Sequence, residues 1–86
     1  MDQRIGTIAI IIEKMESAEK VNALLHEYGK LFIGRMGIPY RERGVHVITL
    51  ITDCSVDELS AITGKIGKLE GVVVKSMMQK NTQKKE

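Results

Sequence analysis

The hydrophobic positions of the chain change their spacing several times, and each change predicts a new element. Residues 4–13 are β-branched and apolar at nearly every position, which is typical of a strand covered on both faces. Residues 18–28 carry apolar side chains at three- and four-residue intervals, the spacing of an amphipathic helix. Ser17 precedes this stripe and Gly29 follows it, so we expect an N-cap and a C-terminal helix signal there.

The middle of the chain predicts two strands of unequal strength. Residues 31–38 form an apolar segment that contains two glycines and is followed by Pro39, a composition that suits an edge strand. Residues 40–44 predict a turn. Residues 45–52 are rich in Val, Ile and Thr, which favours a central strand.

A second helix and a fourth strand complete the pattern. Ser55 and Glu58 have the spacing of a capping box, and apolar residues then follow one helix face as far as Leu69. Gly64 and Gly67 fall within this helix, and we expect them to allow close packing. Residues 72–78 predict the last strand, and residues 80–86 predict a polar, lysine-rich tail.

The predicted order is β-α-β-β-α-β within a single domain of residues 1–79. Two βαβ halves joined by a hairpin make the α+β ferredoxin-like sandwich, a four-stranded antiparallel sheet with both helices on one face. In that arrangement the first and third strands are central and the second is an edge. The β-branched segments and the glycine-interrupted segment agree with those positions.

The second face of this sheet has no helix to cover it, and neither face of the two central strands is charged. A large exposed apolar patch usually marks an interface, and closed homo-oligomers are the commonest solution. We therefore expect a homo-oligomer, either dimer or tetramer, although a loop or the tail could cover the face instead. The expected interface residues are Ile5, Thr7, Ala9 and Ile11 of the first strand and Val45, Val47, Thr49 and Ile51 of the third.

The composition indicates a folded domain and the compartment in which we expect it. The 86 residues are 43% hydrophobic and 28% charged, with a net charge of +2, as in a folded domain. The single cysteine, Cys54, excludes an intrachain disulfide and favours a reducing compartment. The longest apolar run, residues 8–12, is far shorter than the ~20 residues of a membrane span. We expect a cytoplasmic protein without a membrane partner.

The chain shows no convergent acid–base pair, so we expect no enzymatic activity and no cofactor. The central strands lack the aromatic residues with which such sheets stack RNA bases, so we expect no direct nucleic-acid partner. Cys54 precedes a predicted helix N-terminus, which would lower the pKa of its thiol, or it is a partly buried thiol at a strand end. His46 and Cys54 are too few for a closed metal site unless subunits share ligands, so we assign no metal ligand and keep a metal sensor as the alternative.

Three arginines lie within nine residues, in the predicted second strand and the turn that follows it. Guanidinium groups suit carboxylate or phosphate ligands, and glycine lets a ligand approach the backbone. One interpretation is a pocket for a small anionic ligand at a subunit boundary; the other is a solvated hairpin with Glu42 as a local counter-charge. The expected ligand-binding residues are Arg35, Gly37, Tyr40 and Arg41.

Residues 21–28, 35–52 and 63–75 together carry a family resemblance. The elements Arg-x-Gly-x-Pro-x-Arg, from Arg35 to Arg41, and Gly-Lys-x-Gly, from Gly64 to Gly67, resemble those of the small ACT-like regulators of the iron-only hydrogenase system. The resemblance implies an ACT-like ferredoxin fold, an oligomer and a regulatory role linked to hydrogenase genes in anaerobic bacteria. Together with the arginine segment, we expect a ligand-sensing regulatory domain. That fold is also similar to the C-terminal domain of nickel-responsive repressors, which bind nickel through His and Cys. Here only His46 and Cys54 correspond in kind, and the ribbon-helix-helix segment is missing.

Overall fold

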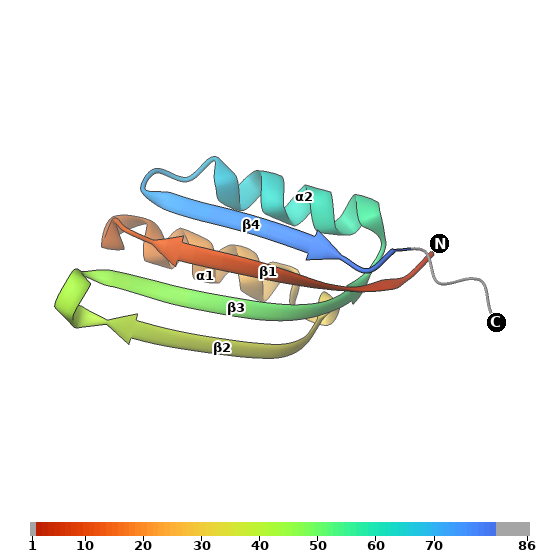
Figure 1. The fold of residues 1–86 in the computed structure, drawn as a ribbon. Coiled ribbons are helices and arrows are strands. Elements are labelled where there is room, and N and C mark those ends of the chain that lie inside the picture. The colour runs from red at the N-terminus through yellow and green to blue at the C-terminus, as the bar shows by residue number, and fades with distance from the viewer. Residues whose placement is uncertain (1, 81–86) are drawn as a thin grey trace.

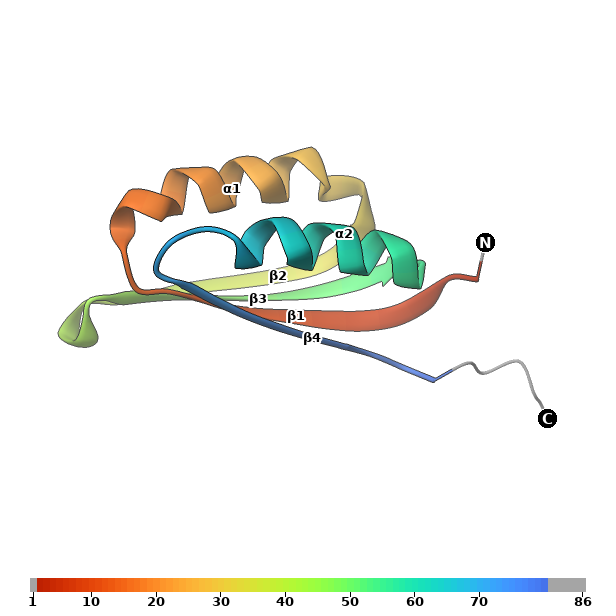
Figure 2. The same cartoon turned by 90° about the horizontal axis from the view of Figure 1, so that it is seen from above.

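A computed structural model describes residues 2–80 and contains four strands and two α-helices. The strands are β1 (Arg4–Ile12), β2 (Phe32–Tyr40), β3 (Val45–Cys54) and β4 (Val72–Met78), and the helices are α1 (Ala18–Glu27) and α2 (Val56–Gly67). The strand order is β2-β3-β1-β4 and every pair is antiparallel. Both helices lie on the same side of the sheet (Figures 1 and 2). The predicted α+β ferredoxin-like sandwich is confirmed, with β1 and β3 central and β2 at an edge.

The core lies between the helices and one face of the sheet. Alternate side chains of β1 and β3 point into it, because strand side chains alternate between the two faces. Apolar stripes of both helices cover these side chains. The buried apolar residues are Ile8, Ile10, Ile12, Val21, Leu25, Ile48, Leu50, Cys54, Leu59, Ile62 and Ile66. Neither described helix combines the length and the apolar character that crossing a membrane requires.

Helix α2 begins at the predicted capping box. The Ser55 hydroxyl oxygen accepts a hydrogen bond from the Glu58 backbone N–H at 3.2 Å, and the Glu58 carboxylate accepts one from the Ser55 N–H at 2.9 Å. Two N–H groups that the helix leaves unpaired are thereby satisfied.

The start of α1 differs from the prediction in its hydrogen bonds, and its end agrees with the prediction. Ser17 has helical backbone angles and no side-chain cap bond; it ends a short 3-10 helix, Met15–Ser17. Its hydroxyl instead donates to the Glu70 carbonyl oxygen at 2.6 Å, so Ser17 joins the start of α1 to the turn before β4. The helix ends at Glu27, and Gly29 begins another 3-10 helix that runs to Leu31. Ser17 therefore occupies the predicted N-cap position without making the capping bond, whereas the helix does end just before Gly29, as predicted.

The turn before β4 depends on a glycine. Gly71 has φ 71°, a left-handed conformation that costs other residues about 1–2 kcal/mol. A Cβ at Gly71 would also lie 2.5 Å from Cγ of Lys14. The Gly71 carbonyl oxygen accepts from the Glu13 and Lys14 N–H groups at 2.6 and 3.3 Å. This turn and the β1–α1 connection therefore hold each other in place.

Both strands of the β2–β3 hairpin extend further than predicted. β2 continues through Pro39 to Tyr40, and the predicted turn consists of a 3-10 helix, Arg41–Arg43, followed by Gly44. Pro39 is tolerated because β2 is an edge strand. It pairs only with β3, so no strand on its other side needs the N–H that proline lacks. β3 continues beyond Thr52 to Cys54, which adds Asp53 to the sheet.

One polar group is buried without a partner. The Thr52 side chain is fully buried, and its Oγ1 has no hydrogen-bond partner among residues 2–80. Gly6 lies beside it: an added Cβ there would lie 2.9 Å from the Met77 carbonyl oxygen and 3.0 Å from Thr52 Oγ1. This part of β1 therefore has no room for a side chain, and the Thr52 hydroxyl carries a desolvation cost.

Candidate functional site

The candidate site is the sheet face that no helix covers, called the open face below (Figure 2). The strand pairing fixes which side chains it carries, because directly paired residues point to the same side. Its residues are Ile5, Thr7, Ala9 and Ile11 of β1; Gly34, Met36, Ile38 and Tyr40 of β2; Val45, Val47, Thr49, Ile51 and Asp53 of β3; and Val73, Lys75 and Met77 of β4.

All eight residues expected at an interface lie together on the open face. Ile5 and Ile51 are 41% and 42% exposed, whereas the apolar residues that alternate with them, such as Ile8 and Leu50, are fully buried. The face continues onto both edge strands, where Met36 is 63% and Met77 71% exposed. These edge contributions were not predicted, although apolar residues at every second position, such as Met36 and Ile38, carry the signal.

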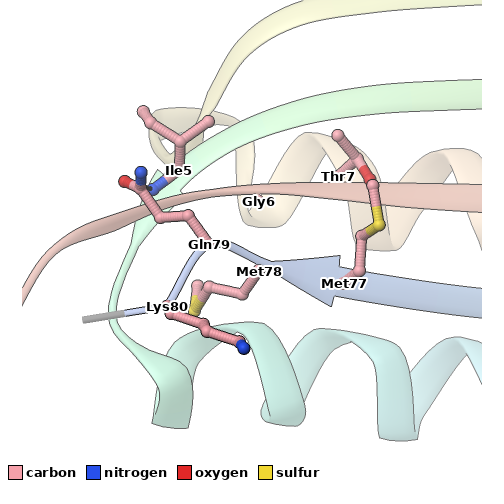
Figure 3. A pocket seen from close by; sticks show the side chains of 7 residues that line it. All are labelled: Ile5, Gly6, Thr7, Met77, Met78, Gln79 and Lys80. Atoms are coloured by element: carbon pink, nitrogen blue, oxygen red, sulfur yellow. Dashed lines mark hydrogen bonds between the residues drawn. The ribbon is translucent and has the colours of Figure 1, made fainter. Parts of the chain in front are cut away.

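A shallow hollow of about 400 Å³ opens at one end of the open face, between β1 and the end of β4. Figure 3 shows the residues that line it, with Ile5 and Thr7 on β1 and Met77 on β4. Gln79 fixes this end of the sheet, because its backbone N–H donates to the Ile5 carbonyl oxygen at 2.9 Å and its side-chain oxygen accepts from the Ile5 N–H at 2.8 Å. The lining is mostly apolar, so the hollow suits an apolar side chain.

The four residues expected to bind a ligand do not share one pocket within a chain. Arg35 and Gly37 pair with buried Leu50 and Ile48, so they lie on the helix side of β2. The Arg35 guanidinium donates to the side-chain oxygen of Asn22 on α1 at 2.9 Å. Tyr40 lies on the open face, on the opposite side of the strand.

Arg41 instead lines a cavity of about 350 Å³ at the tip of the β2–β3 hairpin. The other lining residues are Met15, Pro39, Gly44, Val45 and His46. Arg41 supplies a guanidinium and His46 an imidazole to an otherwise mainly apolar wall, a combination that suits a small anion with an apolar part. The place of His46 beside Arg41 was not predicted, because it depends on the β2–β3 pairing.

His46 and Cys54 lie near opposite ends of β3. Eight residues of strand separate them by about 26 Å, whereas metal–ligand bonds are about 2 Å long. One chain therefore cannot hold a single metal ion with both residues.

Cys54 points into the core and is fully buried. Burial raises the pKa of its thiol, and the Glu58 and Asp53 carboxylates add to the rise. Of the two interpretations of Cys54, the structure therefore supports the buried thiol at a strand end and not a thiol whose pKa the helix N-terminus lowers. A buried thiol that stays protonated is a poor nucleophile, so Cys54 is part of the core.

The Gly-Lys-x-Gly element lies on α2. A Cβ at Gly67 would lie 3.4 Å from Cγ1 of Val74, in ordinary packing contact, but one at Gly64 would meet nothing within 4 Å. Close packing was therefore wrongly expected at Gly64. Lys65 reaches α1, donating to the Tyr28 hydroxyl at 2.7 Å with its ammonium 5.1 Å from the ring centroid. This element links the two helices on the side of the molecule away from the open face.

Residues 4–76 match the TM1266-like family, described as a proposed iron-only hydrogenase system regulator. The chain belongs to this family. Membership in the TM1266-like family confirms the resemblance carried by the Arg-x-Gly-x-Pro-x-Arg and Gly-Lys-x-Gly elements. No curated protein matches the sequence.

Two solved structures resemble the chain. Uncharacterized protein TM1266 from Thermotoga maritima is 30% identical with a TM-score of 0.86, over 91% of this chain and 99% of that one. The ACT domain of the GTP pyrophosphokinase from Chlorobium tepidum is 18% identical with a TM-score of 0.71, over 90% and 89% of the two chains. The second likeness concerns the fold alone, and it confirms the expected ACT-like character of this TM1266-like chain.

Proposed function

We propose that the protein is a non-enzymatic regulatory domain that self-associates through its open face and binds a small anion at the hairpin tip. The observation that carries the proposal is the exposure of apolar side chains on all four strands of that face. The TM1266-like family supports a regulatory role in an iron-only hydrogenase system, and the ACT-like fold supports a binding domain.

Stable association requires that the two partners bury a large apolar area. Association costs about 4–15 kcal/mol in lost freedom of motion, and apolar burial returns only about 25 cal/mol per Å². One or two side chains cannot offset that cost, whereas a face that spans four strands can. Exposed patches of this kind are rare on stable monomers.

A second copy is the partner that this face fits best. Tyr40 is its one aromatic residue and lies on the edge strand β2, so the face lacks the central stacking platform that RNA-binding sheets use. Its two charged strand residues, Asp53 and Lys75, have opposite signs and give no basic surface for phosphates. A homo-oligomer, in contrast, needs only apolar surface and self-complementarity.

Arg41 is the arginine that we assign to the anion. Arg35 already donates to Asn22, whereas no hydrogen bond or ion pair occupies the Arg41 side chain among the described residues. The cavity at Arg41 includes Val45 of the open face. A ligand bound there would therefore lie beside the subunit boundary and could shift the population of one packing of the subunits.

Sedimentation equilibrium tests the association. We expect the wild-type chain to form a dimer or tetramer at micromolar concentration and Ile51→Lys to dissociate it. Val56→Lys is the matched control, because Val56 is 47% exposed but lies on α2; this variant should assemble as wild type does. A wild-type monomer, or equal effects of both substitutions, would contradict the proposal.

Thermal unfolding with added acetate, citrate and inorganic phosphate tests the anion site. At least one of these anions should raise Tm, and Arg41→Ala should remove the rise while leaving the Tm of the free protein nearly unchanged. Arg43→Ala, in the same 3-10 helix, is the control and should keep the rise. If none of the anions raises Tm, or if Arg41→Ala responds as wild type does, the anion site is refuted.

A further inference from the structure

Two opposite charges interrupt the open face. Asp53 of β3 pairs with Ile5, and Lys75 of β4 pairs with Ala9; both are exposed. The remaining strand residues of this face are uncharged. A charge that is covered by apolar protein without a partner costs several kcal/mol, so any occupant of the face must satisfy both groups.

The two charges cannot satisfy each other within one chain. β1 lies between β3 and β4, so the two residues are about 10 Å apart across the sheet and about 13 Å apart along it. The resulting separation of about 16 Å far exceeds ion-pair distance. Among residues 2–80, neither Asp53 nor Lys75 takes part in an ion pair.

We infer that the face binds a second copy about a two-fold axis near Thr7, so that Lys75 of each copy pairs with the partner's Asp53. This inference rests on the proposed self-association and specifies its geometry. Thr7 lies on β1 between the two charged strands, and between Ile5 and Ala9 along the strand, so it is the midpoint of the line joining the charges. An axis through Thr7, in the plane of the interface and perpendicular to that line, exchanges the two positions. Both ion pairs then form at once, as an isologous interface requires.

The same two-fold rotation brings apolar residues of the two copies into contact. It places Ile5 near the partner's Met77, and Ala9 near the partner's Ile51, which sets a small side chain against a large one. Ile5, Thr7 and Met77 also line the hollow of about 400 Å³ at this end of the face, so the axis passes beside the concave part of the surface (Figure 3). Strands of the two copies would cross at roughly 70°, in the orthogonal class of sheet packing.

Charge reversal tests the pairing. Lys75→Glu and Asp53→Lys each create two like-charged pairs per dimer, so each should raise the dimer dissociation constant about 100-fold. The double variant rebuilds both pairs with exchanged signs and should return to within about tenfold of wild type. Lys20→Glu, the same charge change on an exposed residue of α1, should leave the constant unchanged. Sedimentation equilibrium measures all four, and circular dichroism confirms that each variant folds.

The outcomes separate this geometry from the proposed function. Weakened single variants with a restored double variant support the pairing. A double variant as weak as the singles, or singles that bind as wild type does, overturns the pairing, while dissociation by Ile51→Lys would still support association through the face. A monomeric wild-type chain overturns both.

Crosslinking tests the position of the two-fold axis independently. A residue close to a two-fold axis lies near its own copy in the partner. With Cys54 replaced by alanine, Thr7→Cys should therefore give a covalent dimer with a short bismaleimide. Val73→Cys, at the far end of the face, should not. No dimer from Thr7→Cys, or equal yields from both variants, would overturn the placement of the axis.

Discussion

Replacing Thr52 with valine removes the buried hydroxyl of β3 and nearly preserves the shape of the side chain. Thr52 is fully buried, and its Oγ1 has no hydrogen-bond partner among residues 2–80. A hydroxyl that leaves water without gaining a partner costs about 1–3 kcal/mol. We therefore expect Thr52→Val to increase the free energy of unfolding.

The increase should lie at the lower end of that range, at about 1 kcal/mol. A methyl group is larger than a hydroxyl, and the new methyl group must fit beside Gly6. The space there is small, because a Cβ added to Gly6 would lie only 3.0 Å from Thr52 Oγ1. In a domain of this size, about 1 kcal/mol corresponds to a rise of about 4–8 °C in Tm.

Urea unfolding followed by circular dichroism measures the effect, at one protein concentration because association also stabilises the folded chain. Thr52→Ser keeps the hydroxyl and removes a buried methyl group, so it should lose about 1 kcal/mol. The expected order of stability is valine, threonine, serine. A valine variant less stable than wild type would refute the reasoning, because it would show that the hydroxyl is satisfied or that the methyl group does not fit beside Gly6.

Gly71→Ala should lower the free energy of unfolding by at least about 1–2 kcal/mol, because Gly71 has φ 71° and an added Cβ would lie 2.5 Å from Cγ of Lys14. Gly64→Ala should instead stabilise by up to about 1 kcal/mol, since the space around Gly64 on α2 is open; urea unfolding checks both, and equal losses would contradict the distinction. Stability should also fall as the pH rises above about 8.5, because burial raises the pKa of the Cys54 thiol and the folded chain retains a proton that the unfolded chain loses. The slope from this group is at most about 1.4 kcal/mol per pH unit; Cys54→Ala should lack it in alkaline unfolding, and identical pH profiles would refute the assignment.

The sequence predicts well those features that depend on residues close together along the chain. The capping box joins Ser55 to a residue three positions away, so the start of α2 can be read directly. The open-face residues of β1 and β3 follow from strand alternation combined with a predicted sheet. Ser17 could not be read in the same way, because its partner is the carbonyl of Glu70, 53 positions along the chain.

The arginine-rich segment shows a second limit. Alternation separates Arg35 from Tyr40, but the face that each one occupies depends on pairing with β3 and on the irregularity between Phe32 and Gly34. The nearness of Arg41 to His46 likewise requires the folded hairpin. A short run of arginines therefore suggests an anionic ligand without placing the residues that would bind it.

The position of Tyr40 has a practical consequence for spectroscopy. The chain contains no tryptophan and two tyrosines; Tyr28 lies beside Lys65, and Tyr40 lies on the open face with 47% of its surface exposed. In a Tyr28→Phe background, Tyr40 would be the single intrinsic fluorophore. Its emission and anisotropy would then follow association and dissociation of the subunits without an attached dye.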